Sequence, residues 1–351
     1  MSKIRASGSS WSNGLTSNTH SFALSKPFWT ASGAKCSKVV PSQVFGRQAQ
    51  AVAAVVRQCH RREDSFMNVA FFGEHRLVVG ESPIWDVDTQ SLLAVDIVGK
   101  KVIEFDPSGI AFLKLDTPDI VVAATRDRTS RLMLVMGDGL FVQDEAAGTF
   151  EKIATLPQHE GARLNDAKID RQGRFVAVGA DAAMQKPLGV LFRVEHDGSV
   201  DMIADGFTLG NGPCWSPDGS KLYIADSVAK QIYAYDYPTS GPLGERSLFA
   251  DTTDLGGIPD GATVSADGSL WVALCGAGKV VRYDPDGNIQ QTIEMPTAWV
   301  SSVIFGGPAL DRIYVTSLDP VVVGVPGDEH CGRLFVIEGE GATGIAEPRA
   351  F

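Results

Sequence analysis

Polar residues recur at one fixed position ahead of the turns in this 351-residue chain. Each lies seven residues before the residue that opens a turn: Glu81 before Asp88, Asn165 before Gln172, Asn211 before Asp218, and Asp260 before Asp267. Ser302 has the same phase before Ala309, and Asp166 directly follows Asn165. Equal phase in equal structural units means an equal place in the fold, so we expect these side chains to converge on one axis.

Carboxylate and amide oxygens gathered on one axis favour a divalent cation. Two carboxylates placed together repel and raise each other's pKa, whereas a cation neutralises both and uses amide oxygens as further hard ligands. A site built from oxygens alone suits Ca, Mg or Mn, and Zn is possible where Asp or Glu binds. The alternative is that each Asn or Asp only bonds the backbone of its own turn.

The elements that position these residues form a repeat. A strand, a turn and a second strand ending in a D-x-x-G type turn recur from Met67 onward, most clearly in Ser269–Gly287. Six copies begin at residues 92, 131, 174, 221, 269 and 312, so the spacing is 39 to 48 residues. Short strands at this period are typical of propeller blades, and no amphipathic helix separates them. We predict an all-β fold, a six-bladed β-propeller closed by strands from both chain ends.

The charge of the chain divides into two parts. Residues 1–62 contain nine basic and no acidic residues, so the other 22 basic and all 42 acidic residues follow, and that remainder carries −20. An acidic body repels nucleic acid and anionic lipid. No stretch approaches the roughly 20 apolar residues of a membrane-spanning helix. We therefore expect neither nucleic acid nor a membrane as partner, and a monomer or small homo-oligomer.

Five scattered cysteines, none in a C-x-x-C arrangement, indicate a reducing compartment and a cytoplasmic protein. Each is interpreted as a buried small hydrophobic residue rather than a reactive thiol. Residues 1–66 are predicted to be a basic, Ser-rich extension, either disordered or preceding the native start, with an organelle transit peptide as the alternative. Residues 67–351 are predicted to be the propeller domain.

Five segments in order resemble the motifs of the senescence-marker protein/gluconolactonase family, which includes regucalcin. They are GESPIWD (80–86), RLNDAKIDRQGR (163–174), GNGPCWSPDGSKLYIADS (210–227), IPDGATVSADGSLWVAL (258–274) and SSVIFGGPALDRIYVTS (301–317). The resemblance runs from about residue 77 to the C-terminus. It implies a propeller lactonase with one divalent metal ion on the axis, in agreement with the repeat count.

The resemblance also assigns roles to single residues. Glu81, Asn211 and Asp260 match the family's metal ligands, and Asp260 matches the ligand usually credited as general base. Arg163 and Asn165 match substrate-contacting residues. The chain departs from the family at Ala167, where Gly is common, and in VGADAAMQKP (178–187), which lacks the acidic substrate contact of some relatives. We take Asp181 as the substitute for that contact.

The resemblance implies hydrolysis of a sugar-acid lactone to the free acid in carbohydrate catabolism. The cation would polarise the lactone carbonyl and activate water, Asp260 would accept a proton, and Arg163 and Asn165 would hold sugar hydroxyls or the developing oxyanion. For Arg163, a salt bridge to a neighbouring carboxylate is the alternative. Two other functions remain open: a paraoxonase-like esterase or organophosphate hydrolase, and a non-catalytic calcium-binding propeller. The sequence leaves the aldonolactone open among gluconic, galactonic, arabinonic and sulfonated acids.

Overall fold

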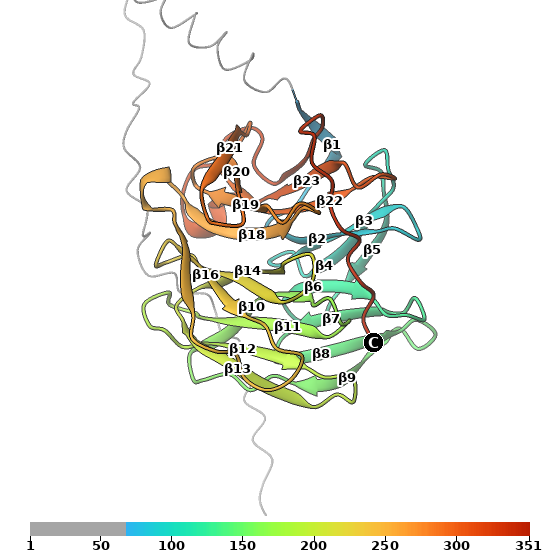
Figure 1. The fold of residues 1–351 in the computed structure, drawn as a ribbon. Helices are drawn as coiled ribbons and strands as arrows, with labels where there is room; N and C mark the ends of the chain where they lie inside the picture. Colours follow the sequence, from blue (N-terminus) through green and yellow to red (C-terminus); the bar gives the residue numbers. More distant parts are fainter. Residues whose placement is uncertain (1–67) are drawn as a thin grey trace, which may run out of the picture.

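The computed structural model describes residues 68–351, which form six four-stranded antiparallel sheets arranged around a central axis (Figure 1). The predicted six-bladed β-propeller is confirmed. The expectations for residues 1–66, and for Cys36 and Cys59, lie outside the described residues. No helix within 68–351 has the length and hydropathy needed to cross a membrane.

Each blade is one sheet, numbered here in chain order from its innermost strand outward. Blade 1 contains β2 (Gly80–Asp86), β3 (Ser91–Asp96), β4 (Lys101–Phe105) and β5 (Ala111–Asp116). Blade 2 contains β6 (Val121–Arg126), β7 (Leu132–Met136), β8 (Gly139–Asp144) and β9 (Thr149–Thr155). Blade 3 contains β10 (Ala162–Ile169), β11 (Phe175–Asp181), β12 (Gly189–Val194) and β13 (Val200–Phe207).

The other three blades repeat this pattern. Blade 4 contains β14 (Gly210–Trp215), β15 (Lys221–Asp226), β16 (Gln231–Asp236) and β17 (Ser247–Asp251). Blade 5 contains β18 (Ile258–Val264), β19 (Leu270–Cys275), β20 (Lys279–Tyr283) and β21 (Ile289–Glu294). Blade 6 contains β22 (Val300–Gly306), β23 (Arg312–Ser317), β24 (Arg333–Ile337) and β1 (Val69–Arg76), while two short 3-10 helices, η2 (Thr253–Leu255) and η3 (Pro320–Val323), lie in loops.

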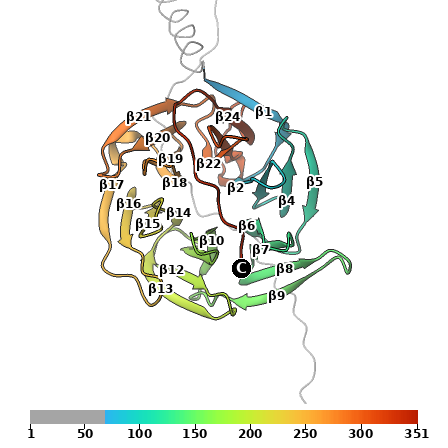
Figure 2. The same ribbon diagram turned by 45° about the vertical axis from the view of Figure 1, so that its right-hand side comes forward.

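The ring closes where the two ends of the propeller pair. Strand β1 from the N-terminal side pairs antiparallel with β24 from the C-terminal side, Phe71 facing Phe335. Figure 2 shows β1 and β24 together at the blade where the colour sequence begins and ends. This confirms the predicted closure by strands from both chain ends, which joins the beginning and the end of the propeller in one sheet.

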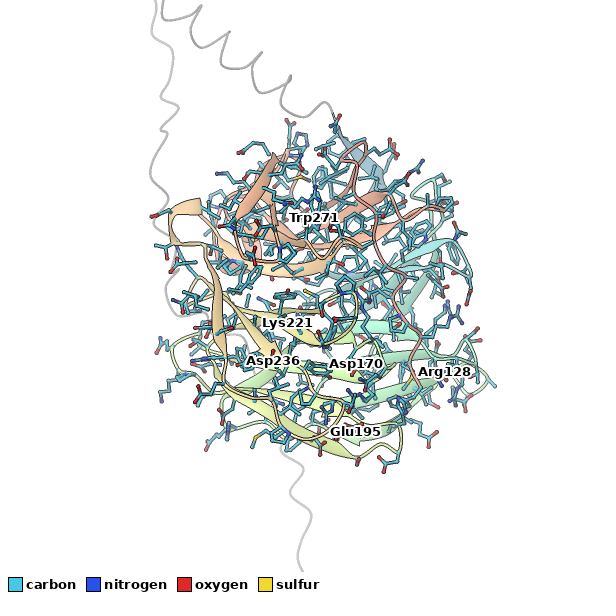
Figure 3. The ribbon with its side chains drawn as sticks, viewed as in Figure 1. Arg128, Asp170, Glu195, Lys221, Asp236 and Trp271 are labelled. Carbon is cyan, nitrogen blue, oxygen red and sulfur yellow. The ribbon has the colours of Figure 1, made fainter. Side chains whose placement is uncertain are left out.

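The core lies between blades rather than inside one blade. Six apolar clusters occupy the six junctions between neighbouring blades. Strands near the axis are buried on both faces, whereas the outer strand β5 alternates between exposed and half-buried positions. Trp271 of blade 5, labelled in Figure 3, is fully buried and meets Phe305 of blade 6 edge to face with 5.7 Å between ring centroids. Packing of this kind fixes how each blade sits against the next.

The C-terminal segment crosses one end of the central channel. After β24 the chain bonds the turns that follow the innermost strands: Ala266 N–H donates to Thr343 O at 2.7 Å, Ala350 N–H to Arg126 O at 3.1 Å, and Phe351 N–H to Gly173 O at 3.1 Å. Figures 1 and 2 show this dark red segment running across the blades to the C-terminus. One end of the channel is therefore covered, and the opposite end holds the starts of the innermost strands.

Candidate functional site

The predicted site residues lie near the starts of the innermost strands, at the channel end away from the C-terminal segment. Glu81 is on β2, Asn165 on β10, Asn211 on β14 and Asp260 on β18, and Ser302 holds the same phase on β22. Neighbouring innermost strands contact each other around the axis. The equal phase seen in the sequence therefore corresponds to an equal place in the fold, as predicted.

A β-bulge aims these side chains. The register of every innermost strand shifts near its start, between Glu81 and Ile84 in β2 and between Asn211 and Cys214 in β14. The equivalent shifts in the other innermost strands are Val121/Ala123, Leu164/Asp166, Pro259/Ala262 and Val300/Ser302. Gly212 has φ 59°, and Ser82 has φ 44° although it is not glycine. A bulge inserts one residue and redirects its neighbour, so each polar side chain is turned out of the pleat.

Three carboxylates interact at this end of the channel. Glu81, Asp166 and Asp260 are all buried. Burial, and then the negative charges of Asp260 and Asp166, raise the pKa of Glu81 well above its ordinary value. Burial and then Asp166 raise the pKa of Asp260 in the same way. The structure thus brings the two carboxylate residues of the predicted ligand set into electrostatic contact.

Glu81 and Asp260 suit a cation because no basic side chain within residues 68–351 balances their negative charge. Glu81 accepts a hydrogen bond from Ser82 N–H at 3.1 Å, Asp260 accepts one from Gly261 N–H, and neither forms an ion pair within residues 68–351. Buried charge without a partner is costly, so the donor set fits a divalent ion held by Glu81, Asp260 and the Asn211 amide oxygen. In the described part of the chain no three His, Cys, Asp or Glu side chains together form a metal-binding group. The set we consider has two carboxylates and an amide.

The amide residues form a directed chain with Arg163. The Arg163 guanidinium donates to Asn165 Oδ1 at 2.6 Å, and Asn165 Nδ2 donates to Asn211 Oδ1 at 2.6 Å and to Gly210 O at 2.9 Å. Arg163 has no carboxylate within ion-pair distance among the described residues, and burial lowers its pKa. The alternative salt-bridge role of Arg163 is therefore not seen. Its cationic group lies beside the candidate ligands.

Asp181 occupies a different position from the other predicted residues. It ends β11, and its carboxylate accepts hydrogen bonds from the backbone N–H groups of Gln185 and Lys186, both at 2.8 Å, and of Ala183 at 3.2 Å. Burial opposes its ionisation, but these bonds keep its pKa low. Asp226, at the end of β15, accepts hydrogen bonds in the same manner from Val228 N–H at 3.2 Å and Ala229 N–H at 3.3 Å in the loop that follows. The substrate contact of Asp181 stays a prediction, and the structure gives it a loop-shaping role.

Two residues to which the sequence analysis gave no ligand or substrate role lie beside the candidate ligands: Asp166, which follows Asn165, and Lys168. Asp166 accepts from Ser82 Oγ at 3.0 Å and from Gly212 N–H at 2.8 Å, so it joins blades 1, 3 and 4. Lys168 Nζ donates to Ala262 O at 2.9 Å and lies 3.8 Å from Glu347 of the C-terminal segment. Both stand in the segment 163–174, but only the folded ring shows what they contact.

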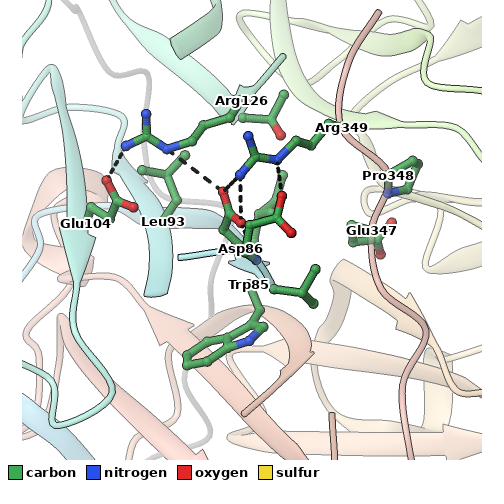
Figure 4. A pocket seen from close by; sticks show the side chains of 12 residues that line it. Trp85, Asp86, Leu93, Glu104, Arg126, Glu347, Pro348 and Arg349 are labelled. Carbon is green, nitrogen blue, oxygen red and sulfur yellow. Dashed lines mark hydrogen bonds and ion pairs between the residues drawn. The ribbon is translucent and has the colours of Figure 1, made fainter. Parts of the chain in front are cut away.

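A cavity of about 190 Å³ lies at the covered end of the channel (Figure 4). Its charged lining residues are already paired: Arg349 with Asp86 at 2.7 Å and Arg126 with Glu104 at 2.5 Å. Burial opposes ionisation of Asp86, yet the bond from Arg349 lowers its pKa. Because these charges satisfy one another, we interpret this cavity as a structural junction, and the candidate site is at the opposite end.

The cysteines of the described region behave as the sequence predicts. Cys214, Cys275 and Cys331 are free and buried. Burial raises the pKa of Cys214 to about 12, and burial together with the charges of Asp260 and Glu81 raises the pKa of Cys275. A thiol that stays protonated at neutral pH is a poor nucleophile. None of these cysteines competes with Asp260 for the role of reactive group.

Comparison with known proteins agrees with this architecture. Residues 79–319 match the model of the SMP-30/Gluconolactonase/LRE-like region. Regucalcin of Xenopus laevis is 33% identical over 289 residues, 78% of this chain and 94% of that protein. L-arabinolactonase of Azospirillum brasilense is 32% identical over 269 residues, 75% of this chain and 89% of that protein. The crystal structure of regucalcin from Agrobacterium tumefaciens, titled a calcium-binding protein, has a TM-score of 0.72 at 26% identity and covers 80% of this chain and 96% of its own.

Proposed function

This chain belongs to the SMP-30/gluconolactonase/LRE-like family, and we propose that it is a metal-dependent lactonase that opens a sugar-acid lactone to the free acid. The observation that carries the proposal is the pair of buried, uncompensated carboxylates Glu81 and Asp260 beside the Asn211 amide. The lactonase names of relatives such as L-arabinolactonase support the reaction class.

The residues present can divide the work of hydrolysis among them. When bound by Glu81, Asn211 and Asp260, a divalent cation supplies Lewis-acid polarisation of the lactone carbonyl. The Asp260 carboxylate takes a proton from the attacking water as the new carbon–oxygen bond forms. The bond between the carbonyl carbon and the ring oxygen then breaks, and the ring oxygen leaves as a hydroxyl after taking the proton that Asp260 received from the water. Arg163 donates hydrogen bonds to sugar hydroxyls or to the oxyanion. Asn165, whose two N–H groups bond Asn211 Oδ1 and Gly210 O, contributes to substrate binding through Oδ1, which holds the Arg163 guanidinium.

The environment of Asp260 suits a base of this kind. Its buried carboxylate accepts a hydrogen bond from Gly261 N–H, so an oxygen that does not bind the cation would be free to take a proton from water. Arg163 keeps its donors free of carboxylates, so they remain available to a neutral, hydroxyl-rich ligand. The acidic body and the free buried cysteines fit a cytoplasmic enzyme that acts on a small molecule.

The test is a lactone panel on protein stripped with EDTA and supplied with Ca, Mg, Mn or Zn, one at a time, with acid release as the readout. The panel contains gluconic, galactonic, arabinonic and sulfonated lactones, plus a phosphotriester for the paraoxonase-like alternative. Asp260→Ala should lower turnover by about 10²- to 10⁴-fold. Asp236→Asn, at an exposed carboxylate that pairs with Lys221 (Figure 3), is the control and should leave turnover unchanged.

The second candidate is a calcium-binding propeller without catalysis, and the calcium-binding title of the Agrobacterium protein favours keeping it. It predicts calorimetric binding of calcium at the same residues with no acid release from any lactone. Turnover that appears with a metal and is lost in Asp260→Ala would exclude it. Turnover that persists in EDTA would instead refute the metal dependence.

A further inference from the structure

Ser227 is a fully buried residue that follows β15 and touches two of the blades that carry candidate ligands. Its Oγ accepts a hydrogen bond from Asn211 Nδ2 at 2.8 Å. Its hydroxyl donates to the carbonyl oxygen of Pro259 at 2.6 Å, and Pro259 directly precedes Asp260. The Ser227 backbone is held as well, because its N–H donates to Leu209 O at 2.9 Å.

These bonds continue the chain described above and fix its direction from both ends. A guanidinium can only donate and a backbone carbonyl can only accept. The series of hydrogen bonds therefore starts at Arg163 and passes through Asn165, Asn211 and Ser227 to Pro259 O, and each residue donates to the next. Reversing any amide would set donor against donor or acceptor against acceptor.

The consequence for Asn211 is specific. A hydroxyl has one hydrogen, and that of Ser227 is used by Pro259, so Ser227 can offer Asn211 only an acceptor. The Asn211 amide must turn its NH₂ group toward Ser227 and its oxygen the other way, toward Asn165. A carbonyl oxygen has two lone pairs. One accepts from Asn165, and the second remains for a ligand.

We propose that Ser227 is a positioning residue for the metal site: it fixes the Asn211 amide with its oxygen toward the cation and holds the backbone just before Asp260. This inference rests on the proposed metal-dependent function. Partners that orient a ligand from behind typically change metal affinity by about 10- to 100-fold when removed. Without Ser227, the Asn211 NH₂ group loses its buried acceptor, and only the hydrogen bond from Asn165 still holds the amide.

Ser301 provides a matched control. It is also fully buried, and its hydroxyl donates to the backbone oxygen of Gly80 at 2.5 Å, just before Glu81. Its other partner is the Thr316 hydroxyl at 2.9 Å, so it contacts no candidate ligand side chain. Ser301→Ala and Ser227→Ala therefore both leave a buried carbonyl without its donor. Only Ser227→Ala also removes a hydrogen bond to a candidate ligand side chain, the one from Asn211 Nδ2.

The experiment measures Ca²⁺ and Mn²⁺ binding to the full chain by titration calorimetry after EDTA treatment. Circular dichroism checks the fold of each variant. Ser227→Ala should weaken binding about 10- to 100-fold, whereas Ser301→Ala should stay within about 3-fold of wild type. Ser227→Thr keeps the hydroxyl and should restore most of the affinity, which a simple loss of folding in the alanine variant would not explain.

Two negative results distinguish failure of the proposed role of Ser227 from failure of the proposed metal-dependent function. Wild-type protein that binds neither cation would overturn the metal dependence, and the role of Ser227 with it. Wild-type protein that binds a cation, with Ser227→Ala no weaker than Ser301→Ala, would overturn the role of Ser227 alone.

Discussion

Replacing Asp260 by Asn should make the metal-free protein more stable, although it removes a residue of the proposed site. Asp260 is buried, accepts a backbone hydrogen bond from Gly261, and faces the negative charges of Glu81 and Asp166. A buried polar group without compensation costs about 1–3 kcal/mol, and more when it is charged. Removing the charge should therefore raise the unfolding free energy by at least roughly 1–3 kcal/mol.

The assay is thermal unfolding followed by circular dichroism, in EDTA and then with calcium. A gain of 1–3 kcal/mol corresponds to roughly 2–5 °C in Tm for residues 68–351, because the unfolding entropy is about 2.1 cal/mol/K per residue. Calcium at a thousand times its dissociation constant should add about 4.1 kcal/mol to the wild type, more than the roughly 1–3 kcal/mol expected for Asp260→Asn in EDTA. It should add little to Asp260→Asn, so the order of the two melting temperatures should reverse on adding metal.

Asp226→Asn is the matched control for this experiment. Asp226 is as buried as Asp260, but its carboxylate accepts backbone hydrogen bonds from Thr208 N–H at 2.8 Å and Leu209 N–H at 3.2 Å. Each bond to a charged group is worth about 1.5–3 kcal/mol, so this variant should lose stability with and without metal. If Asp260→Asn is destabilised like Asp226→Asn in EDTA, the claim of an uncompensated carboxylate is wrong.

The pH dependence of the same samples has a definite sign. The folded pKa values of Glu81 and Asp260 are raised, so the folded state binds protons more tightly than the unfolded state, whose carboxyl pKa values are near 4. Metal-free wild type should therefore gain stability from these groups as pH falls through the raised values toward about 4. Asp260→Asn should show a smaller gain. An identical pH profile for the two proteins would contradict this account.

Three further predictions concern the rest of the propeller. Asp170→Asn should cost roughly 1.5–3 kcal/mol in urea unfolding, because Arg174 loses its buried partner at 2.7 Å and keeps only the more exposed Glu195 at 3.2 Å as an ion-pair partner; a loss below 1 kcal/mol would mean that the pair is not needed. Glu347→Gln should speed hydrogen exchange in the C-terminal segment by removing two buried ion pairs, while metal affinity stays unchanged. Hydrogen bonds from the Ser216 hydroxyl and from the backbone and hydroxyl of Ser220 lower the pKa of Asp218 to about 2. The stabilising contribution of Asp218 should therefore be present above pH 4 and be lost as pH falls toward 2. An NMR titration that gives Asp218 an ordinary carboxyl pKa would contradict this.

The fold could be predicted because it is repeated. Strand patterns at a 39- to 48-residue spacing identify six blades, and each predicted start lies within one residue of the second strand of its blade, as with Lys221 and β15. The common phase of Glu81 and Asp260 is readable for the same reason. In a repeat, equivalent sequence positions occupy equivalent places in the fold, so a position assigned in one blade predicts the corresponding position in the others.

What the sequence could not provide are contacts between blades. Ser227 meets Asn211 and Pro259 only because blades 4 and 5 are adjacent, and nothing in its local pattern distinguishes it from a loop serine. The left-handed φ of Ser82 is equally hidden, since glycine is the residue expected there. The pairing of Glu347 with Lys168 joins residues far apart in the chain across the channel end.

The two ends of the channel differ in a way that bears on the function. At the covered end, Asp86 and Glu347 each lie within ion-pair distance of basic side chains, and the pKa of Asp86 is lowered. At the open end, Glu81 and Asp260 have raised pKa values and no ion-pair partner within residues 68–351. Carboxylates at the covered end are therefore paired with basic side chains, whereas Glu81 and Asp260, near the bulges at the starts of their strands, are not. That contrast is expected of an end that is completed by a cation from solution.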